Sequence, residues 1–132
     1  MTKLDSYLKE NRSKCFKIGE HDCFTFTNQW WKIKTGSGFA SALEGQYSGA
    51  KPQTYQAMLR NHFGVSDAYS ALDRLLTRRA GFAHRGDIVA MDRDAGSYTG
   101  VAMGICIGTT SAFVAPHGLV FVDTDTVKGA WF

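Results

Sequence analysis

The clearest chemical feature of this chain is a cysteine at the predicted start of a helix. His21, Asp22 and Cys23 directly precede residues 24–31, an apolar stretch that predicts a buried helix. A thiol in the first turn of a helix lies near unpaired backbone N–H groups and the positive end of the helix dipole, and both favour the thiolate. Cys23 is therefore the candidate nucleophile, and a histidine has to serve as its base.

Cys23 also has interpretations without nucleophilic chemistry. Cysteine is among the residue types most often buried, so this thiol is also explained as part of a helix start with no catalytic role. A metal site would combine Cys15, His21 and Cys23 with one more histidine, but the two cysteines lack the close spacing of zinc sites. The sequence therefore predicts neither a metal nor a cofactor.

The composition favours one compact domain over residues 1–132. Hydrophobic residues make up 44% of the 132 residues, which suits one core and leaves little room for two. The formal charge of +3 is modest, and the densest basic group, Arg78, Arg79 and Arg85, is interpreted as a solvated surface rather than a nucleic-acid footprint. Three cysteines predict no disulfide framework, and no segment resembles a signal peptide or a membrane span.

The periodicity of the apolar residues changes from helical to extended near residue 84. Helices are expected over residues 3–12, 23–34, 52–63 and 66–76, and strands over residues 87–91, 101–107, 112–115, 119–122 and 130–132. The expected fold is α+β, with N-terminal helices packed on a C-terminal antiparallel meander of four or five strands. Because Trp30 and Trp31 are adjacent on one helix, one of them is expected to face away from the core and mark a contact surface.

Several motifs occur in a fixed order along the chain. An Asp-Cys pair at a helix start is followed by Arg85-Gly86-Asp87 at the start of a strand, by the Met-Gly-Ile-Cys-Ile-Gly of residues 103–108 and by a hairpin through residues 118–120. This order resembles that of the NlpC-like cell-wall peptidases, which have a papain-like fold. Gly45-Gln46-Tyr47 and the terminal Ala130-Trp131 are similar, more closely, to a small group encoded in the tail modules of phages and prophages.

The resemblance implies roles for the residues around the cysteine. In the family, the cysteine attacks an amide carbonyl of a peptidoglycan stem peptide and a histidine acts as its base. Cys23 matches the nucleophile, Asp22 matches the neighbour that shapes the substrate end of the site, and His21 is predicted to contact the substrate beside it. The family has Ser-Gly after its cysteine, whereas this chain has Phe24 and Thr25, so the contacts of that serine do not carry over.

The position of the base departs from the family. The family's histidine stands two residues before the glycine that matches Gly104, so the matching position is Ala102, which cannot take a proton. The histidines that remain as substitutes are His21, His62, His84 and His117. We predict His117 as the base, because its hairpin follows the strand that carries the family's orienting residue. The alternative is that His117 is an ordinary turn residue.

Two functions of different classes follow from the resemblance. One is a phage tail-tip peptidase that cleaves peptidoglycan stem peptides during infection. The other is a catalytically inactive structural or assembly component of the tail tip that keeps the fold as a scaffold. Both predict synthesis in the host cytoplasm, incorporation into the virion tail and contacts with other tail-tip or hub proteins, and neither involves nucleic acid.

Overall fold

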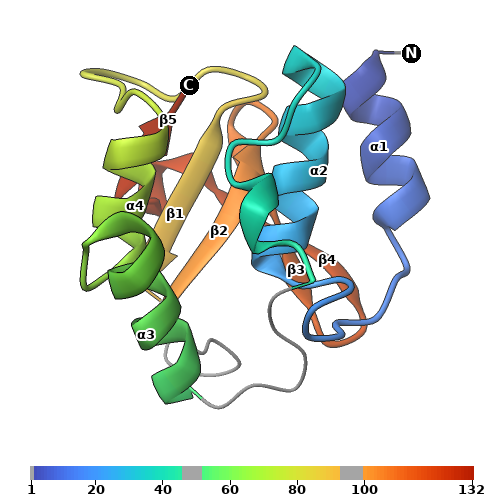
Figure 1. Ribbon diagram of the computed structural model, residues 1–132. Helices are drawn as coiled ribbons and strands as arrows, with labels where there is room; N and C mark the ends of the chain where they lie inside the picture. The colour runs from blue at the N-terminus through green and yellow to red at the C-terminus, as the bar shows by residue number, and fades with distance from the viewer. Residues whose placement is uncertain (1, 46–51, 93–99) are drawn as a thin grey trace.

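The computed structural model describes residues 2–45, 52–92 and 100–132. Its helices lie on one side of a twisted sheet (Figure 1). The four α-helices in the described residues are α1 (Lys3–Asn11), α2 (Cys23–Thr35), α3 (Pro52–Phe63) and α4 (Ala68–Leu75), with short 3-10 turns η1 (Ser41–Leu43) and η2 (Thr124–Thr126). The strands are β1 (Ile88–Asp92), β2 (Val101–Cys106), β3 (Thr110–Ala115), β4 (Gly118–Asp123) and β5 (Gly129–Trp131). The α+β prediction is confirmed.

The sheet has five antiparallel strands in the order β4-β3-β2-β1-β5. The first four strands form the predicted meander, but β5 does not continue it. After β4 the chain crosses one face of the sheet and pairs with the free edge of β1, where Trp131 lies opposite Ile88. This crossing is stabilised because Val127 covers apolar residues on that face of the sheet.

The two faces of the sheet carry separate apolar clusters. Alternation along each strand sends one set of residues toward the helices, where it joins Phe26 and Trp30 of α2. The opposite face carries a smaller cluster of Val89, Ala102, Cys106, Phe113 and Ala130. α2 packs on β2 and β3 and contacts α1 on its other side, so it is the central helix of the domain.

Contrary to expectation, both tryptophans of α2 are buried, with 4% of Trp30 and 8% of Trp31 exposed. The chain after α2 turns back over the helix and is fixed on the buried side chain of Asn28, which accepts a hydrogen bond from the Ala40 N–H and donates one to Glu44. This returning segment buries a second side of α2. Neither tryptophan therefore marks an exposed contact surface.

The Arg85-Gly86-Asp87 motif connects β1 to the rest of the core. Asp87 is fully buried and forms a bidentate ion pair with Arg79, with N–O distances of 2.6 and 3.0 Å. The Gly86 carbonyl accepts a 2.9 Å hydrogen bond from the Trp30 indole N–H. Since Trp30 belongs to α2, this motif holds the start of β1 at the C-terminal half of the helix. Of the Gly45-Gln46-Tyr47 landmark, residues 46 and 47 lie outside the described residues.

Candidate functional site

Cys23 is the first residue of α2, and its side chain is half-buried. The preceding residue, Asp22, is the N-cap, with an extended backbone that ends the incoming loop. Asp22 accepts a 2.8 Å hydrogen bond from the Thr25 N–H, and the Thr25 hydroxyl accepts one of 2.8 Å from the Asp22 N–H. Cys23 is thus presented from a well-capped helix start, as the sequence predicts.

Asp22 and Thr25 have structural tasks at this helix start. The second carboxylate oxygen of Asp22 accepts a 2.8 Å hydrogen bond from the Gly19 N–H, and only 6% of the residue is exposed. Thr25 occupies the third helical position, where it closes a capping box with Asp22. Thr25 therefore strengthens the helix start. The role of Asp22 toward substrate stays a prediction.

His21 precedes the cap, and its imidazole packs against α2. Its backbone pairs with Lys17 through two hydrogen bonds of 2.7 and 2.9 Å, and its ring meets the Phe26 ring edge-on at 6.1 Å between centroids. The ring nitrogen Nε2 is buried and has no hydrogen-bond partner. Burial and the nearby positive charge of Lys14 lower the pKa of His21 below 6.5, against the opposing effect of Asp22. The imidazole is therefore neutral at pH 7.

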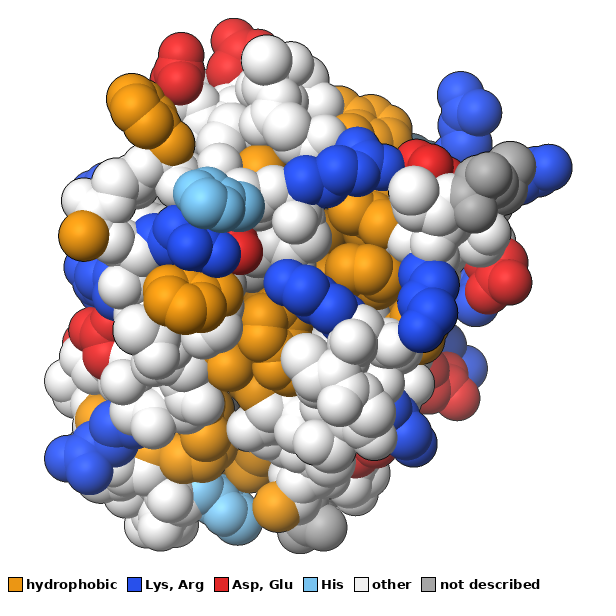
Figure 2. Space-filling view, turned by 90° about the horizontal axis from the view of Figure 1, so that it is seen from above, with side chains coloured by type: hydrophobic (Ala, Val, Ile, Leu, Met, Phe, Trp, Pro, Cys, Tyr) orange, Lys and Arg blue, Asp and Glu red, His pale blue; other side chains and the backbone are white. Residues whose placement is uncertain are grey.

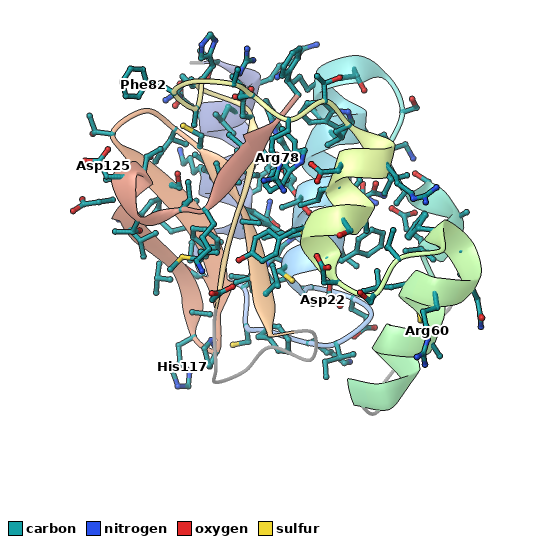
Figure 3. All side chains as sticks on the ribbon, turned by 90° about the vertical axis from the view of Figure 1, so that its left-hand side faces the viewer. Asp22, Arg60, Arg78, Phe82, His117 and Asp125 are labelled. Carbon is teal, nitrogen blue, oxygen red and sulfur yellow. The ribbon has the colours of Figure 1, made fainter. Side chains whose placement is uncertain are left out.

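His117 lies in the turn between β3 and β4 and is exposed. Figure 3 shows its ring projecting from this turn into solvent, away from Asp22. The ring of the predicted base is therefore directed into solvent, and its role as base stays a prediction. The turn is tight, because Ala115 pairs directly with Gly118, so it holds the His117 ring outside the sheet.

The position that matches the family's base lies on the far face of the sheet. Ala102 belongs to the cluster with Val89 and Cys106, on the face opposite α2. The β2 residues that face the helices are Val101, Met103 and Ile105, and none of them can accept a proton. A side chain at position 102 would therefore point away from Cys23 in this register.

The other two histidines lie on other elements of the fold. His62 lies in the last turn of α3, with its ring 6.1 Å from that of Phe63. His84 lies in the loop before β1, where its backbone N–H donates to the Asp87 carboxylate. Of the four candidate bases, His21 is the one that the structure places at the start of α2. Its adjacency to Cys23 was the signal, but its packing on Phe26 was not predictable from sequence.

Cys15 and Cys106 do not lie at a helix start. Cys106 is fully buried in β2, and its sulfur lies 3.4 Å from the Gly108 carbonyl oxygen, whereas Cys15 is exposed in the loop after α1. Among residues 2–45, 52–92 and 100–132, no three His, Cys, Asp or Glu side chains gather as a metal site. Within those same segments, no helix has the length and apolarity needed to cross a membrane.

Five basic residues of the described structure form ion pairs with acidic neighbours. The densest group is paired with carboxylates: Arg78 with Asp73, Arg79 with Asp87, and Arg85 with Asp5. Figure 2 shows Lys and Arg side chains on one face of the molecule interspersed with acidic, polar and apolar ones. This arrangement supports the interpretation of the basic group as a solvated surface. That the protein does not bind nucleic acid stays a prediction.

A surface hollow lies on the face of the sheet opposite α2. It measures 490 Å³ and lies between residues 78–83 and residues 124–130. Phe82 at its rim is 91% exposed, and Figure 3 shows its ring standing away from the loop. The charged side chains that line this hollow include Arg79 and Lys128, which pair with Asp87 and Asp92. The hollow therefore offers no uncompensated positive charge from these two residues.

One family is similar to this chain along its whole length. A family model described as a domain of unknown function (DUF6950) matches residues 1–132. Among curated proteins, none matches the chain.

Proposed function

The chain belongs to the DUF6950 family, and we propose that it is a phage tail-tip protein with the cysteine peptidase activity of the NlpC-like enzymes. The observation that carries the proposal is the placement of Cys23 at the capped first turn of a central helix that packs on an antiparallel sheet. The phage setting and the substrate are supported by the order of sequence motifs, from Asp22-Cys23 through Arg85-Gly86-Asp87 to the C-terminus.

The proposed chemistry is amide hydrolysis through a thioester. The neutral imidazole of His21 takes the thiol proton, and the resulting thiolate attacks an amide carbonyl of a peptidoglycan stem peptide. The imidazolium returns the proton to the leaving amine as the C–N bond breaks. Water then hydrolyses the thioester and restores the free thiol of Cys23.

We assign the base to His21 because its environment suits proton transfer at neutral pH. Its pKa is lowered by burial, so the imidazole is unprotonated. Its Nε2 is buried without a hydrogen-bond partner, so in this proposal the ring turns from its packing on Phe26 to reach the thiol. Both it and Cys23 flank the N-cap of α2. His117, the base predicted from the sequence, is exposed in the turn between β3 and β4, and Figure 3 shows its ring directed into solvent.

A second function is favoured by the far-face position of Ala102. Ala102, which matches the base of the NlpC-like peptidases, points away from α2 in this fold. The helix-facing side of β2 is wholly apolar. Strand β2 therefore offers Cys23 no proton acceptor. In this second proposal the protein is an inactive structural component of the tail tip, and Cys23 has no chemical role.

Digestion of purified peptidoglycan distinguishes the two proposals. The peptidase proposal expects release of new amino groups by the native chain and a fall to background in Cys23→Ser. His21→Gln should lower the rate by about a hundredfold, the usual size of a lost general base, whereas His117→Gln should have little effect. Cys15→Ser is the matched control for loss of an exposed thiol and should be fully active.

Other outcomes of this assay have definite meanings. Loss of activity in His117→Gln together with full activity in His21→Gln would return the base to the turn between β3 and β4. No digestion by the native chain, with normal infection by phage that carry Cys23→Ser, would contradict the peptidase proposal and support the structural one.

A further inference from the structure

In the described structure, one edge of the sheet is covered by a further segment of the chain, whereas the other edge is open. Beyond β5, residues 77–79 add a further antiparallel segment, through hydrogen bonds of 2.9 Å in both directions between Thr77 and Phe132 and one of 2.8 Å from Arg79 to Ala130. On the other side, β4 pairs with β3 alone among the described residues. β4 is apolar, with 39% of Val120 and 48% of Phe121 exposed. Such an edge is a template for pairing with another strand.

The register of the β3–β4 hairpin determines which β4 groups point outward. The two-residue turn makes Ala115 and Gly118 the hydrogen-bonded closing pair, and hydrogen-bonded and non-hydrogen-bonded pairs then alternate along the ladder. Leu119, Phe121 and Asp123 therefore direct their backbone N–H and C=O groups away from β3. The Leu119 N–H confirms this direction, because it donates a 3.0 Å hydrogen bond to the Arg12 carbonyl outside the sheet.

Two of the outward backbone groups of β4 are already hydrogen-bonded within the chain, and the remaining ones match those of a second β4 strand. Leu119 N–H is bonded to Arg12, and the Asp123 carbonyl accepts a 2.7 Å hydrogen bond from the Thr126 hydroxyl. In the described structure, the Leu119 carbonyl, both groups of Phe121 and the Asp123 N–H have no partner. In an antiparallel pairing of two β4 strands about Phe121, these free groups face each other. The Leu119 N–H and the Asp123 carbonyl would gain no partner in the second copy, and both are already hydrogen-bonded within their own chain.

The charges at the two ends of β4 fit the same pairing. Arg12 lies against the start of the strand, and Asp123 and Asp125 lie at its end; all three are exposed and, among the residues that the structure describes, form no ion pair. An antiparallel two-fold pairing brings Arg12 of each chain beside the acidic end of the other. Opposite charges at such positions favour this register over its alternatives.

The path of the chain leaves room for a second copy at this edge. After Asp123 the backbone turns into η2, where the Thr124 N–H bonds to the Thr109 carbonyl, and it then crosses to β1, where the Lys128 N–H bonds to Ala90. The chain therefore leaves the line of the edge at the point where Arg12 of a partner would lie. Figure 3 shows Asp125 on this turn, directed outward.

We propose that the protein forms a two-fold dimer in which β4 pairs with β4 of a second copy about Phe121. The two five-stranded sheets then become one continuous sheet. Four hydrogen bonds join the chains: two between the Phe121 residues, and one from each Asp123 N–H to the Leu119 carbonyl of the other copy. The dimer is independent of any chemistry at Cys23.

Analytical ultracentrifugation of the full chain tests the proposal. We expect a mass that rises with concentration from 14.5 kDa toward twice that value. Phe121→Pro removes only outward N–H groups and two of the four intermolecular bonds, so it should weaken the dimer by about tenfold or more. Phe121→Thr keeps the N–H group and should weaken the dimer less, and Phe82→Thr, the control at another exposed aromatic, should not change it.

Charge exchange tests the register. Arg12→Glu or Asp123→Lys alone should weaken the dimer, whereas both changes in one chain should restore it. A mixture of the two single variants should form mixed dimers more tightly than either variant pairs with itself. A dimer that is indifferent to these changes uses another face and would overturn the proposal.

Amide hydrogen exchange gives a readout that does not depend on a variant folding. The amides of Phe121 and Asp123 should exchange rapidly in dilute solution and slowly in concentrated solution, while the Leu119 amide is protected at both. A chain that is monomeric up to about 1 mM would refute the dimer, including the case in which the edge instead pairs with an extended segment of another protein.

Discussion

Three consecutive side chains at the start of α2 have different physical tasks. Asp22 bonds backbone N–H groups on both sides of the turn and caps the helix. Cys23 presents a half-buried thiol in the first turn. His21 places a neutral imidazole against Phe26. One short motif therefore combines a helix start signal, a nucleophile and a proton acceptor, and its effects can be separated by single substitutions.

At the residue scale, the lowered pKa of His21 predicts how stability depends on pH. The folded protein binds the imidazole proton less tightly than the unfolded chain, so the unfolded state holds more protons just below pH 6.5. Stability from this residue is complete above pH 6.5 and is lost as the pH falls from 6.5 through the lower pKa of His21 in the folded protein. Urea unfolding should therefore show a smaller loss of stability between pH 7 and 5 in His21→Gln than in the native chain.

The control for this measurement is a histidine that the fold leaves in solvent. His117→Gln removes an exposed imidazole and should leave the slope of stability against pH as it is in the native chain. An unchanged slope in His21→Gln would show that the ring is not held in the environment described.

At the scale of elements, the position of α2 depends on how the loop before β1 is held. Asp87 is buried and receives both the Arg79 guanidinium and the His84 N–H, while the adjacent Gly86 carbonyl binds Trp30. The loop therefore links α2 to the first strand through buried polar contacts. Such contacts are costly to break, because one partner is left uncompensated inside the protein.

This loop gives a prediction about stability. Asp87→Asn should lower the free energy of unfolding by about 3 kcal/mol, since Arg79 loses its buried carboxylate. The exposed pair Lys17–Glu20 is the comparison, and Lys17→Ala should lower the free energy of unfolding far less, because solvent screens this pair. Equal costs for the two variants, measured by urea unfolding, would contradict the role given to the loop.

The sequence predicts most elements because their signals are local. α2 runs from its cap at Asp22 to Gly36, which has a positive φ of 96°, and the helical and extended patterns separate near residue 84 as expected. The crossing of β5 was missed, because it depends on which strand edge is free and not on the residues of β5. The burial of Trp31 was missed because the sequence does not show that residues 36–45 return over α2.

The candidate site was predictable only in part. The helix start at Cys23 follows from the Asp-Cys pattern and is found in the structure. The identity of a base was not predictable, because the direction of each histidine ring depends on how the loop or turn around it folds. His21 is turned onto Phe26 by its pairing with Lys17, and His117 is turned outward by a tight hairpin.

At the scale of the whole molecule, the proposed site and the proposed dimer edge lie on different elements. Cys23 lies at the start of α2, whereas the free edge belongs to β4. The dimer variants at Phe121 should therefore retain any peptidoglycan digestion, and the Cys23 variants should retain the dimer. The two proposals are tested independently by making both measurements on the same proteins.

The most direct test of the central claim, that the fold activates Cys23, is the alkylation rate of each cysteine by iodoacetamide at pH 7. Cys15 is the more exposed thiol, and Cys106 is fully buried. If the helix start and His21 favour the thiolate, Cys23 reacts fastest despite being only half-exposed, and His21→Gln slows it while leaving Cys15 unchanged. Faster labelling of Cys15 than of Cys23 would contradict this account.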